Sequence, residues 1–325
     1  MKNTQSFATR LALFIFATTP FCGLTNAQDY PVKPIQFQIG FALGGSSDLV
    51  SRLVADQLAK RLGQPVVPIN KPTAGGVIAN ETVAKASPDG YNLVLLTSGH
   101  PIAAVMSTNM PYDAVKDFAM VSTVTSYPML LTVAADSPLR SMDQLLTRAR
   151  AKPGTITYAI AGPASAHRLL GELIQIEAKA EMVGVTFKGA AQAMIDLLGG
   201  RIDAMVETAT FSLPQVKGGK MRALAVSTAG RYAPLPDVAT VAETVPGIDF
   251  ASWLGLATTP GTPRPIINRL HREIGEMLKT TEVRQQLANL GGEATPSTPD
   301  QMRDKISGEM ARWKRVMEIR KINPN

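Results

Sequence analysis

A chain of 325 residues, 45% hydrophobic and 18% charged, is long and apolar enough to bury a sizeable core, which excludes an intrinsically disordered protein and favours two domains. Its formal net charge of +7 is spread without any run of five like charges or a recognisable nucleic-acid-binding module. The composition therefore excludes a charged tail, a collagen, a coiled coil and nucleic acid as a partner.

Residues 1–27 have the three-part layout of a secretory signal. Basic residues precede the apolar stretch 11–17, and small residues occupy the −3 and −1 positions of a cleavage site that ends at Ala27. We therefore expect cleavage after Ala27 and export to the periplasm. An uncleaved anchor and a lipoprotein are the alternatives, and the bulky Phe21 before Cys22 argues against lipidation.

Cys22 is the only cysteine and lies inside this leader. The exported chain would then hold no disulfide and no thiolate metal site. The three histidines do not recur at metal-ligand spacings, so no metal and no cofactor is predicted. No segment after the leader reaches the length of a membrane span, and we expect a soluble product.

Strands and helices alternate along the first part of the mature chain. Strands are predicted near 34–41, 66–69 and 93–97, and helices run from Asp48 to Gly63 and over 78–86. This alternation predicts a parallel sheet flanked by helices.

A second α/β unit with the same plan is predicted after residue 120. Its strands are expected at 121–133, 156–160, 183–187, 203–206 and 222–227, and its helices at 142–149, 166–178 and 191–198. Residues 228–250 are rich in Pro, Ala and Thr and are predicted to be a surface connection. A strand at 252–257 and helices at 266–278, 282–290 and 301–319 close the chain.

The first unit carries a Gly44-Gly45-Ser46-Ser47 loop between its first strand and helix. Such a loop presents backbone N–H groups, hydroxyl groups and the positive end of a helix dipole to one point, where an anion binds well. The alternative is a tight turn closed by a Ser or Asp cap. The loop lacks the lysine and the spacing of a phosphate-binding P-loop.

Gly162 to Ser165 stand at the equivalent place in the second unit. The starts of the two helices could face each other across a cleft, a geometry that suits a small carboxylate better than a nucleotide. Arg168 follows within the first turn and could bind a carboxylate through two hydrogen bonds, or it could be a solvated helix charge.

Ser98 and His100 follow a predicted buried strand, at the end where the clefts of α/β folds open. They are therefore candidate ligand contacts, although a core histidine is the alternative. The nucleophile elbow Gly-x-Ser-x-Gly of hydrolases is absent from the sequence, and we predict no catalysis.

Several blocks resemble one known family, the extracytoplasmic receptors of tripartite tricarboxylate transporters, or Bug proteins. In chain order they are Phe41-Ala42-Leu43-Gly44-Gly45-Ser46-Ser47-Asp48, Ser87-Pro88-Asp89-Gly90-Tyr91, Pro111-Tyr112-Asp113, Phe187-Lys188-Gly189-Ala190, Asp196-Leu197-Leu198-Gly199-Gly200, Arg222-Ala223-Leu224-Ala225-Val226 and Leu235-Pro236-Asp237-Val238-Ala239-Thr240. They run in family order from about residue 30 to the C-terminus, so the resemblance covers the mature chain.

The resemblance implies a two-lobed periplasmic-binding-protein fold of the second type, in which each lobe is a mixed sheet flanked by helices and a helical tail follows. The first lobe would comprise 28–122 and the returning segment 251–325, and the second lobe would comprise 123–250. The implied function is a monomeric receptor that captures a small organic carboxylate and delivers it to the permease in the membrane. An exported hydrolase-like enzyme and a ligand-sensing subunit are the alternatives.

The resemblance also implies a ligand site between two loops, one over Phe41 to Asp48 and the other over Tyr158 to Ser165. The predicted ligand-binding residues are Phe41, Gly44, Gly45, Ser46, Ser47, Asp48, Ser98, His100, Ala161, Gly162, Ser165, Arg168 and Glu207.

The second loop departs from the family pattern at several positions. Ile160 replaces a serine, Ala164 replaces a glycine, and Arg168 takes the place of a histidine. Glu207 occupies a family position that often bears an aspartate. If it faces the cleft, its carboxylate would repel a second ligand carboxylate unless it pairs with a cation or with an amine of the ligand.

Overall fold

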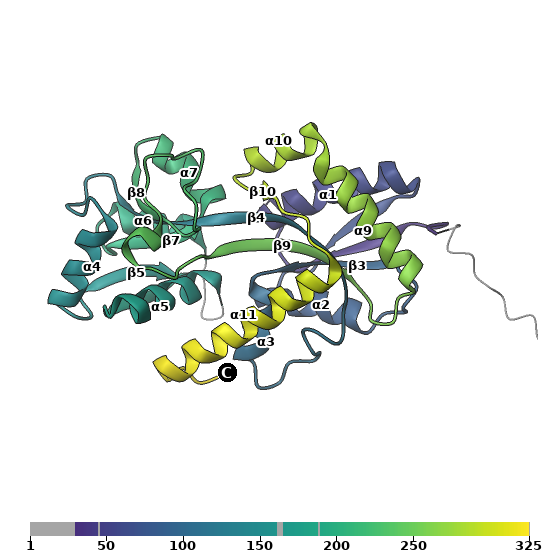
Figure 1. Cartoon of the computed structure of the whole chain (residues 1–325), viewed down its shortest axis with the longest axis horizontal. Helices are drawn as coiled ribbons and strands as arrows, with labels where there is room; N and C mark the ends of the chain where they lie inside the picture. The colour runs from purple at the N-terminus through teal and green to yellow at the C-terminus, as the bar shows by residue number, and fades with distance from the viewer. Residues whose placement is uncertain (1–29, 45, 161–164, 188, 325) are drawn as a thin grey trace, which may run out of the picture. The chain divides into compact units, whose positions relative to one another are not determined.

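The computed structural model describes residues 30–44, 46–160, 165–187 and 189–324 (Figure 1). The predicted leader over 1–27, Gly45 and the segment 161–164 lie outside the described residues. Residues 31–325 form one compact unit. Within the described ranges, none of the helices combines the length and the apolar composition that a bilayer crossing requires.

Strands and helices alternate as predicted in the first part of the chain. The elements are β1 (Ile35–Ile39), α1 (Ser46–Leu62), β2 (Val66–Asn70), the short 3-10 helix η2 (Ala74–Gly76), α2 (Val77–Ala84), β3 (Asn92–Thr97), α3 (Gly99–Met106) and β4 (Ala119–Ala134). The second part comprises α4 (Met142–Ala151), β5 (Ile156–Ile160), α5 (Ala166–Ala178), β6 (Met182–Thr186), α6 (Ala190–Leu198), β7 (Ala204–Thr208), α7 (Ala209–Lys217), β8 (Met221–Val226) and α8 (Val241–Thr244). The chain closes with β9 (Ala251–Thr258), α9 (Arg264–Lys279), α10 (Thr281–Asn289), β10 (Glu293–Ala294) and α11 (Pro299–Arg320).

The strands form a mixed sheet in the order β2-β1-β3-β9-β4-β7-β5-β6, with β8 and β10 also paired to β4. In the first half-sheet, β1 runs parallel to β2 and β3, and β9 runs antiparallel to β3 and β4. In the second half-sheet, β5 runs parallel to β6 and β7, whereas β7 and β8 run antiparallel to β4. The predicted α/β fold with mixed sheets and a C-terminal helix is confirmed.

The long strand β4 belongs to both half-sheets. Its residues Ala119 to Pro128 pair with β9, and Met129 to Ala134 pair with β7 or β8. Its 16 residues are almost all buried, because both of its faces are covered. Apolar side chains pack into the core while buried Ser and Thr hydroxyls find backbone partners, as when Thr125 Oγ1 donates to the Glu293 carbonyl at 2.8 Å.

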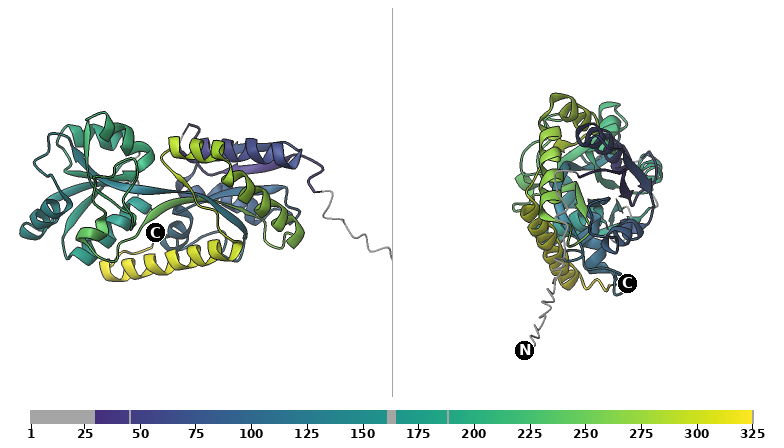
Figure 2. Two further views of the ribbon diagram at one scale, coloured as in Figure 1. Left: turned by 45° about the horizontal axis from the view of Figure 1, so that its top comes forward. Right: turned by 90° about the vertical axis from the view of Figure 1, so that its right-hand side faces the viewer.

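The C-terminal helix α11 packs against both parts of the molecule (Figure 2). Its first turns place Met302 and Ile306 in the hydrophobic cluster of the first half-sheet. Its last turns place Trp313 and Met317 in the cluster of the second half-sheet, with contacts to α5. Thr298 begins the helix with a capping box that Gln301 completes.

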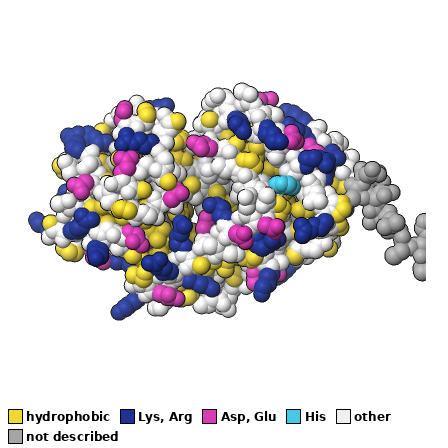
Figure 3. Space-filling model, in the orientation of Figure 1, with side chains coloured by type: hydrophobic (Ala, Val, Ile, Leu, Met, Phe, Trp, Pro, Cys, Tyr) yellow, Lys and Arg dark blue, Asp and Glu magenta, His cyan; other side chains and the backbone are white. Residues whose placement is uncertain are grey.

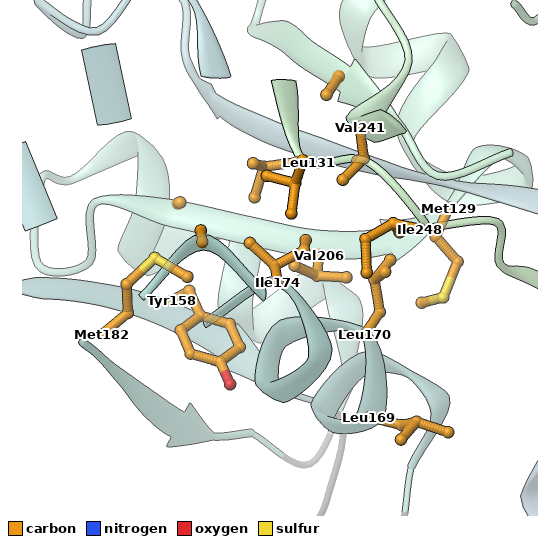
Figure 4. Packing of buried hydrophobic residues seen from close by; sticks show 14 of the residues in the cluster. Met129, Leu131, Tyr158, Leu169, Leu170, Ile174, Met182, Val206, Val241 and Ile248 are labelled. Atoms are coloured by element: carbon orange, nitrogen blue, oxygen red, sulfur yellow. The ribbon is translucent and has the colours of Figure 1, made fainter. Parts of the chain in front are cut away.

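The core of the second half-sheet positions α5. Figure 4 shows Tyr158 of β5, Ile174 of α5 and Val206 of β7 in one cluster of buried side chains. Gly171 faces the Tyr158 ring so closely that a Cβ atom there would lie 2.5 Å from the phenol oxygen. The glycine therefore lets α5 approach β5, and the start of α5 is fixed relative to the carboxyl end of the sheet.

Candidate functional site

The first predicted loop lies between the end of β1 and the start of α1. Gly44 adopts a left-handed conformation with φ of 79°, which favours glycine, and its amide donates to Asp48 Oδ2 at 3.0 Å. Gly40, just after β1, would bring any Cβ into the backbone of Gly76. The conformation of this loop therefore depends on the turn at Gly44 and on the close approach of the backbone at Gly40 to the backbone at Gly76.

Asp48 holds the first loop together. Its carboxylate is 2% exposed and accepts hydrogen bonds from the Gly44 amide, from Arg52 Nε at 3.1 Å and from Asn70 Nδ2 at 2.9 Å. Burial by itself raises the pKa of Asp48, but these hydrogen bonds outweigh it and the pKa is lowered. The carboxylate is thus ionised and satisfied from within the protein.

The other described residues of the first loop lie between β1 and the first turn of α1. The Phe41 side chain is half-buried, and its carbonyl accepts from Asn70 Nδ2 at 3.0 Å. Ser46 is the first residue of α1, and the Ser47 carbonyl accepts from Ser51 Oγ within the helix. Gly45 falls outside the described residues. The structure thus gathers the described members of the loop at the start of α1.

The second loop follows β5 and leads into α5. Ser165 is the N-cap of α5, with its side chain accepting from the Arg168 amide at 3.3 Å. Ala161 and Gly162, both predicted ligand contacts, lie outside the described residues. Of this loop the structure describes Ser165, which caps a 13-residue helix.

Glu207 lies on β7 and pairs with His167 in the first turn of α5, an interaction that the sequence did not indicate. His167 Nε2 and Glu207 Oε1 are 2.9 Å apart. The same oxygen accepts from the Thr208 amide at 2.7 Å. Glu207 thus has a partner that can carry a positive charge, one of the two conditions under which the sequence argument allowed a second ligand carboxylate. Spacing could not have revealed it, because the partners are 40 residues apart and meet through the sheet order.

Arg168 lies in a charged network between α5 and α11. Its Nε is 3.6 Å from Glu172 Oε1, and Glu172 Oε2 accepts from Arg320 Nε at 2.8 Å. Arg320 also contacts Glu181 at 2.8 Å. Arg168 thus pairs with a carboxylate of the protein itself, Glu172, and this pairing argues against its predicted role as a ligand anchor.

Ser98 and His100 are enclosed rather than presented to a ligand. Ser98 is 3% exposed, and its Oγ lies 2.8 Å from Ser252 Oγ on β9. His100 is fully buried, its Nε2 lies 2.9 Å from the Ala114 carbonyl, and its Nδ1 lies 3.2 Å from Asn80 Nδ2. Burial lowers the pKa of His100 to about 4, so its ring is neutral at physiological pH. The structure corrects the prediction for His100, which is a core residue.

The surface agrees with a site for a small molecule. Figure 3 shows this face hollowed between the two half-sheets, with Lys and Arg interspersed among Asp and Glu rather than gathered in one patch. A void of about 10 Å³, room for one water molecule, borders Glu207 and has mainly apolar walls: Ala159, Ile160, Phe187, Ala190, Ala193, Met205 and Val206. Among the described residues, no group of three His, Cys, Asp or Glu side chains is arranged to hold a metal ion.

Comparison with known proteins gives a consistent match. The model of the tripartite tricarboxylate transporter family receptor matches residues 50–323. Protein BugT of Bordetella pertussis is 36% identical over 320 residues, which cover 98% of each chain. Two solved structures are also similar. Rpa4515 of R. palustris with adipate has a TM-score of 0.82 and 31% identity over 91% of this chain and 100% of that one. MatC of Rhodopseudomonas palustris with bound malate has a TM-score of 0.76 and 30% identity over 88% of this chain and 99% of that one.

Proposed function

This chain belongs to the tripartite tricarboxylate transporter family of receptors, and we propose that it holds a small organic carboxylate between the loops that begin α1 and α5. The predicted Bug-type family is confirmed, and the chain is a solute-binding receptor rather than an enzyme. The alternatives of an exported hydrolase and a sensing subunit receive no support from the matched proteins.

The observation that carries the proposal is a repeated arrangement. In each half-sheet a parallel strand ends, a loop with Gly and Ser follows, and a helix of at least 13 residues begins at once. Both helix starts leave backbone N–H groups and the positive end of the helix dipole directed away from the sheet. Two such starts facing one carboxylate would supply hydrogen-bond donors from opposite sides.

The similar solved structures are consistent with this ligand class, because one contains adipate and one contains malate. Both ligands carry two carboxylates on a short aliphatic chain. In the present protein the void next to Glu207 measures about 10 Å³, room for one water molecule, so the ligand would lie outside it, between the two loops. We propose the same class of ligand here and leave the choice within that class to experiment.

Receptors of this family work in the periplasm, and the proposal extends to the path that the chain and its ligand take. Cleavage after Ala27 would release the mature receptor, and a monomer carrying its ligand would then dock on the permease subunits of the transporter. The long helix α11 packs against both half-sheets and would connect the two lobes as they close on the ligand.

A thermal-shift titration of the mature protein tests the proposal. Adipate and malate are the probes, and dimethyl adipate is the matched control because it keeps the chain and loses both charges. A bound acid at a hundredfold excess over its Kd stabilises the native state by about 2.7 kcal/mol, and the ester should give no shift. The proposal is wrong if neither acid raises Tm, or if the ester raises it equally.

A further inference from the structure

His167 and Glu207 form an ion pair at the carboxyl edge of the second half-sheet. Glu207 is the fourth residue of the five-residue strand β7, and His167 is the second residue of α5, two residues after its N-cap Ser165. The His167 side chain is 16% exposed and the Glu207 side chain 9%. The pair thus lies beside the helix start to which the proposed function assigns the ligand.

One ring nitrogen of His167 in this pair lacks a hydrogen-bond partner among the described residues. Three donors converge on Glu207 Oε1: His167 Nε2, the Thr208 amide and Thr208 Oγ1. The other ring nitrogen, His167 Nδ1, is buried and has no hydrogen-bond partner among the described residues. A protonated imidazole has two N–H donors, so the second one lacks an acceptor.

The charges of the pair support each other. Burial alone raises the pKa of Glu207, but His167 and Thr208 outweigh it and the pKa is lowered. Burial alone lowers the pKa of His167, but the Glu207 carboxylate outweighs it and the pKa is raised. Each group therefore favours the charged form of the other, an imidazolium beside a carboxylate.

Other charged groups around α5 have partners elsewhere. Arg168, on the same helix, lies against Glu172, which in turn accepts from Arg320 of α11. Asp203, just before β7, accepts from the Thr157 amide and hydroxyl, at the end of the strands far from Glu207. Glu207 is thus the charged group that faces His167 within the described part of the chain.

We propose that His167 is a specificity-determining residue of the ligand site. As an imidazolium it cancels the charge of Glu207 and donates its Nδ1–H to a carboxylate of the ligand, so the receptor binds its anion only in the state with a proton on His167. This inference rests on the proposed function. Loss of that proton would leave the Glu207 carboxylate uncompensated beside an anionic ligand and remove the donor.

The consequence is a link between affinity and pH. Below the raised pKa of His167 the affinity for a carboxylate is constant, because the proton is already in place. Above that pKa one proton must be taken up on binding, and Kd rises tenfold per pH unit. The acids themselves are fully ionised in this range, so their own titration does not contribute.

The first measurement needs no ligand. A titration of the histidine ring signals by NMR in the free protein should give His167 a midpoint above the ordinary value of 6.5. The variant Glu207→Gln should lower this midpoint toward 6.5 or below, because it keeps the shape of the side chain and removes the charge. A midpoint at or below 6.5 in the unaltered protein would contradict the proposed ion pair.

The second measurement is the Kd of adipate and malate by calorimetry between pH 6.5 and 9.5. We expect Kd to rise at least tenfold across this range in the unaltered protein. His167→Gln should bind at least tenfold more weakly at pH 6.5 and show no pH dependence. His271→Gln is the matched control, because His271 lies on α9 and contacts the Val121 carbonyl in the first half-sheet. It should reproduce the unaltered curve.

The outcomes separate this inference from the proposed function. Binding of an acid with a pH-independent Kd overturns the role of His167 and leaves the carboxylate receptor intact. Binding of neither acid overturns both. If His167→Gln does not fold, the variant Glu207→Gln tests the role of His167 instead. Its Kd should begin to rise at a lower pH than in the unaltered protein, and an unchanged midpoint would count against the inference.

Discussion

The starts of α1 and α5 occupy equivalent places in their half-sheets, yet they are held in different ways. At α1, the carboxylate of Asp48 bonds the backbone of its own loop and a side chain of β2. At α5, the cap Ser165 is local, and the helix is fixed from outside by Tyr158 against Gly171 and by Arg320 against Glu172. The first loop is therefore fixed within itself, whereas the second depends on the packing of its helix.

This difference suggests a division of labour between the two loops. A loop fixed by an ionised, satisfied carboxylate keeps its backbone donors in one arrangement. Under the proposed function, the helix start that carries the titratable pair would be the one whose binding responds to pH. Three substitutions test whether the two helix starts differ in this way, and their expected effects on stability range from about 3 to about 1 kcal/mol.

Asp48→Ala should have the largest effect. It removes the acceptor of three hydrogen bonds, from the Gly44 amide, Arg52 Nε and Asn70 Nδ2, which costs about 3 kcal/mol in the free energy of unfolding. Carboxylate affinity should fall more than tenfold, because the backbone donors lose their arrangement. Urea denaturation and calorimetry measure the two effects.

The control for this variant lies on the same helix. Asp56 also pairs with a cation four residues later, Lys60, but both side chains are about 60% exposed, and Asp56→Ala should cost less than about 0.5 kcal/mol. Because the pKa of Asp48 is lowered from 3.8, its contribution is complete above that value and is lost as the pH falls through the folded pKa. The unaltered protein and Asp48→Ala should then converge in stability in acid. Equal losses in the two variants would show that Asp48 does not fix the loop.

Gly171→Ala should have the next largest effect and act on the second helix start. The added methyl group would meet the buried Tyr158 ring, which is 1% exposed, and the overpacking costs about 2 kcal/mol. Gly275→Ala in α9 is the matched control, because nothing lies within 4 Å of its Cβ position. It should stabilise the protein by about 0.5 kcal/mol through helix propensity. Thermal unfolding compares them, and equal shifts would exclude the close approach as the reason for Gly171.

Much of this architecture could be predicted from the sequence, because its causes are local. Alternating apolar runs and turns located most strands, and the apolar stretch predicted at 121–133 became β4 over Ala119–Ala134. The helix α3 was not predicted, since its sequence Gly99-His100-Pro101 begins with residues typical of a turn. It forms because Pro101 lies in its first turn, where no backbone N–H is needed, and its apolar side chains are buried.

The candidate site was predictable in part for the same reason. A Gly and Ser loop between a strand and a helix is visible in the sequence. What could not be predicted is tertiary pairing, because His167 meets Glu207 and Arg168 meets the network of Arg320 only through the packing of α5. His100, whose place after a strand favoured a ligand contact, is enclosed by tertiary neighbours of its own, Asn80, Tyr112 and Phe118.

Arg320→Ala should have the smallest effect and tests the outer support of α5. Arg320 is 22% exposed and joins the end of α11 to Glu172 and Glu181, so its loss should cost about 1 kcal/mol, more at low than at high salt. Arg303→Ala is the control, because it breaks an exposed pair with Asp300 on the same helix and should change stability by less than about 0.5 kcal/mol. Urea denaturation at two salt concentrations measures both. If Arg320→Ala weakened carboxylate binding while Arg303→Ala did not, the second loop would depend on α11, as the comparison of the two helix starts requires. If Arg320→Ala lowered stability but left binding unchanged, the contacts of Arg320 would serve folding alone.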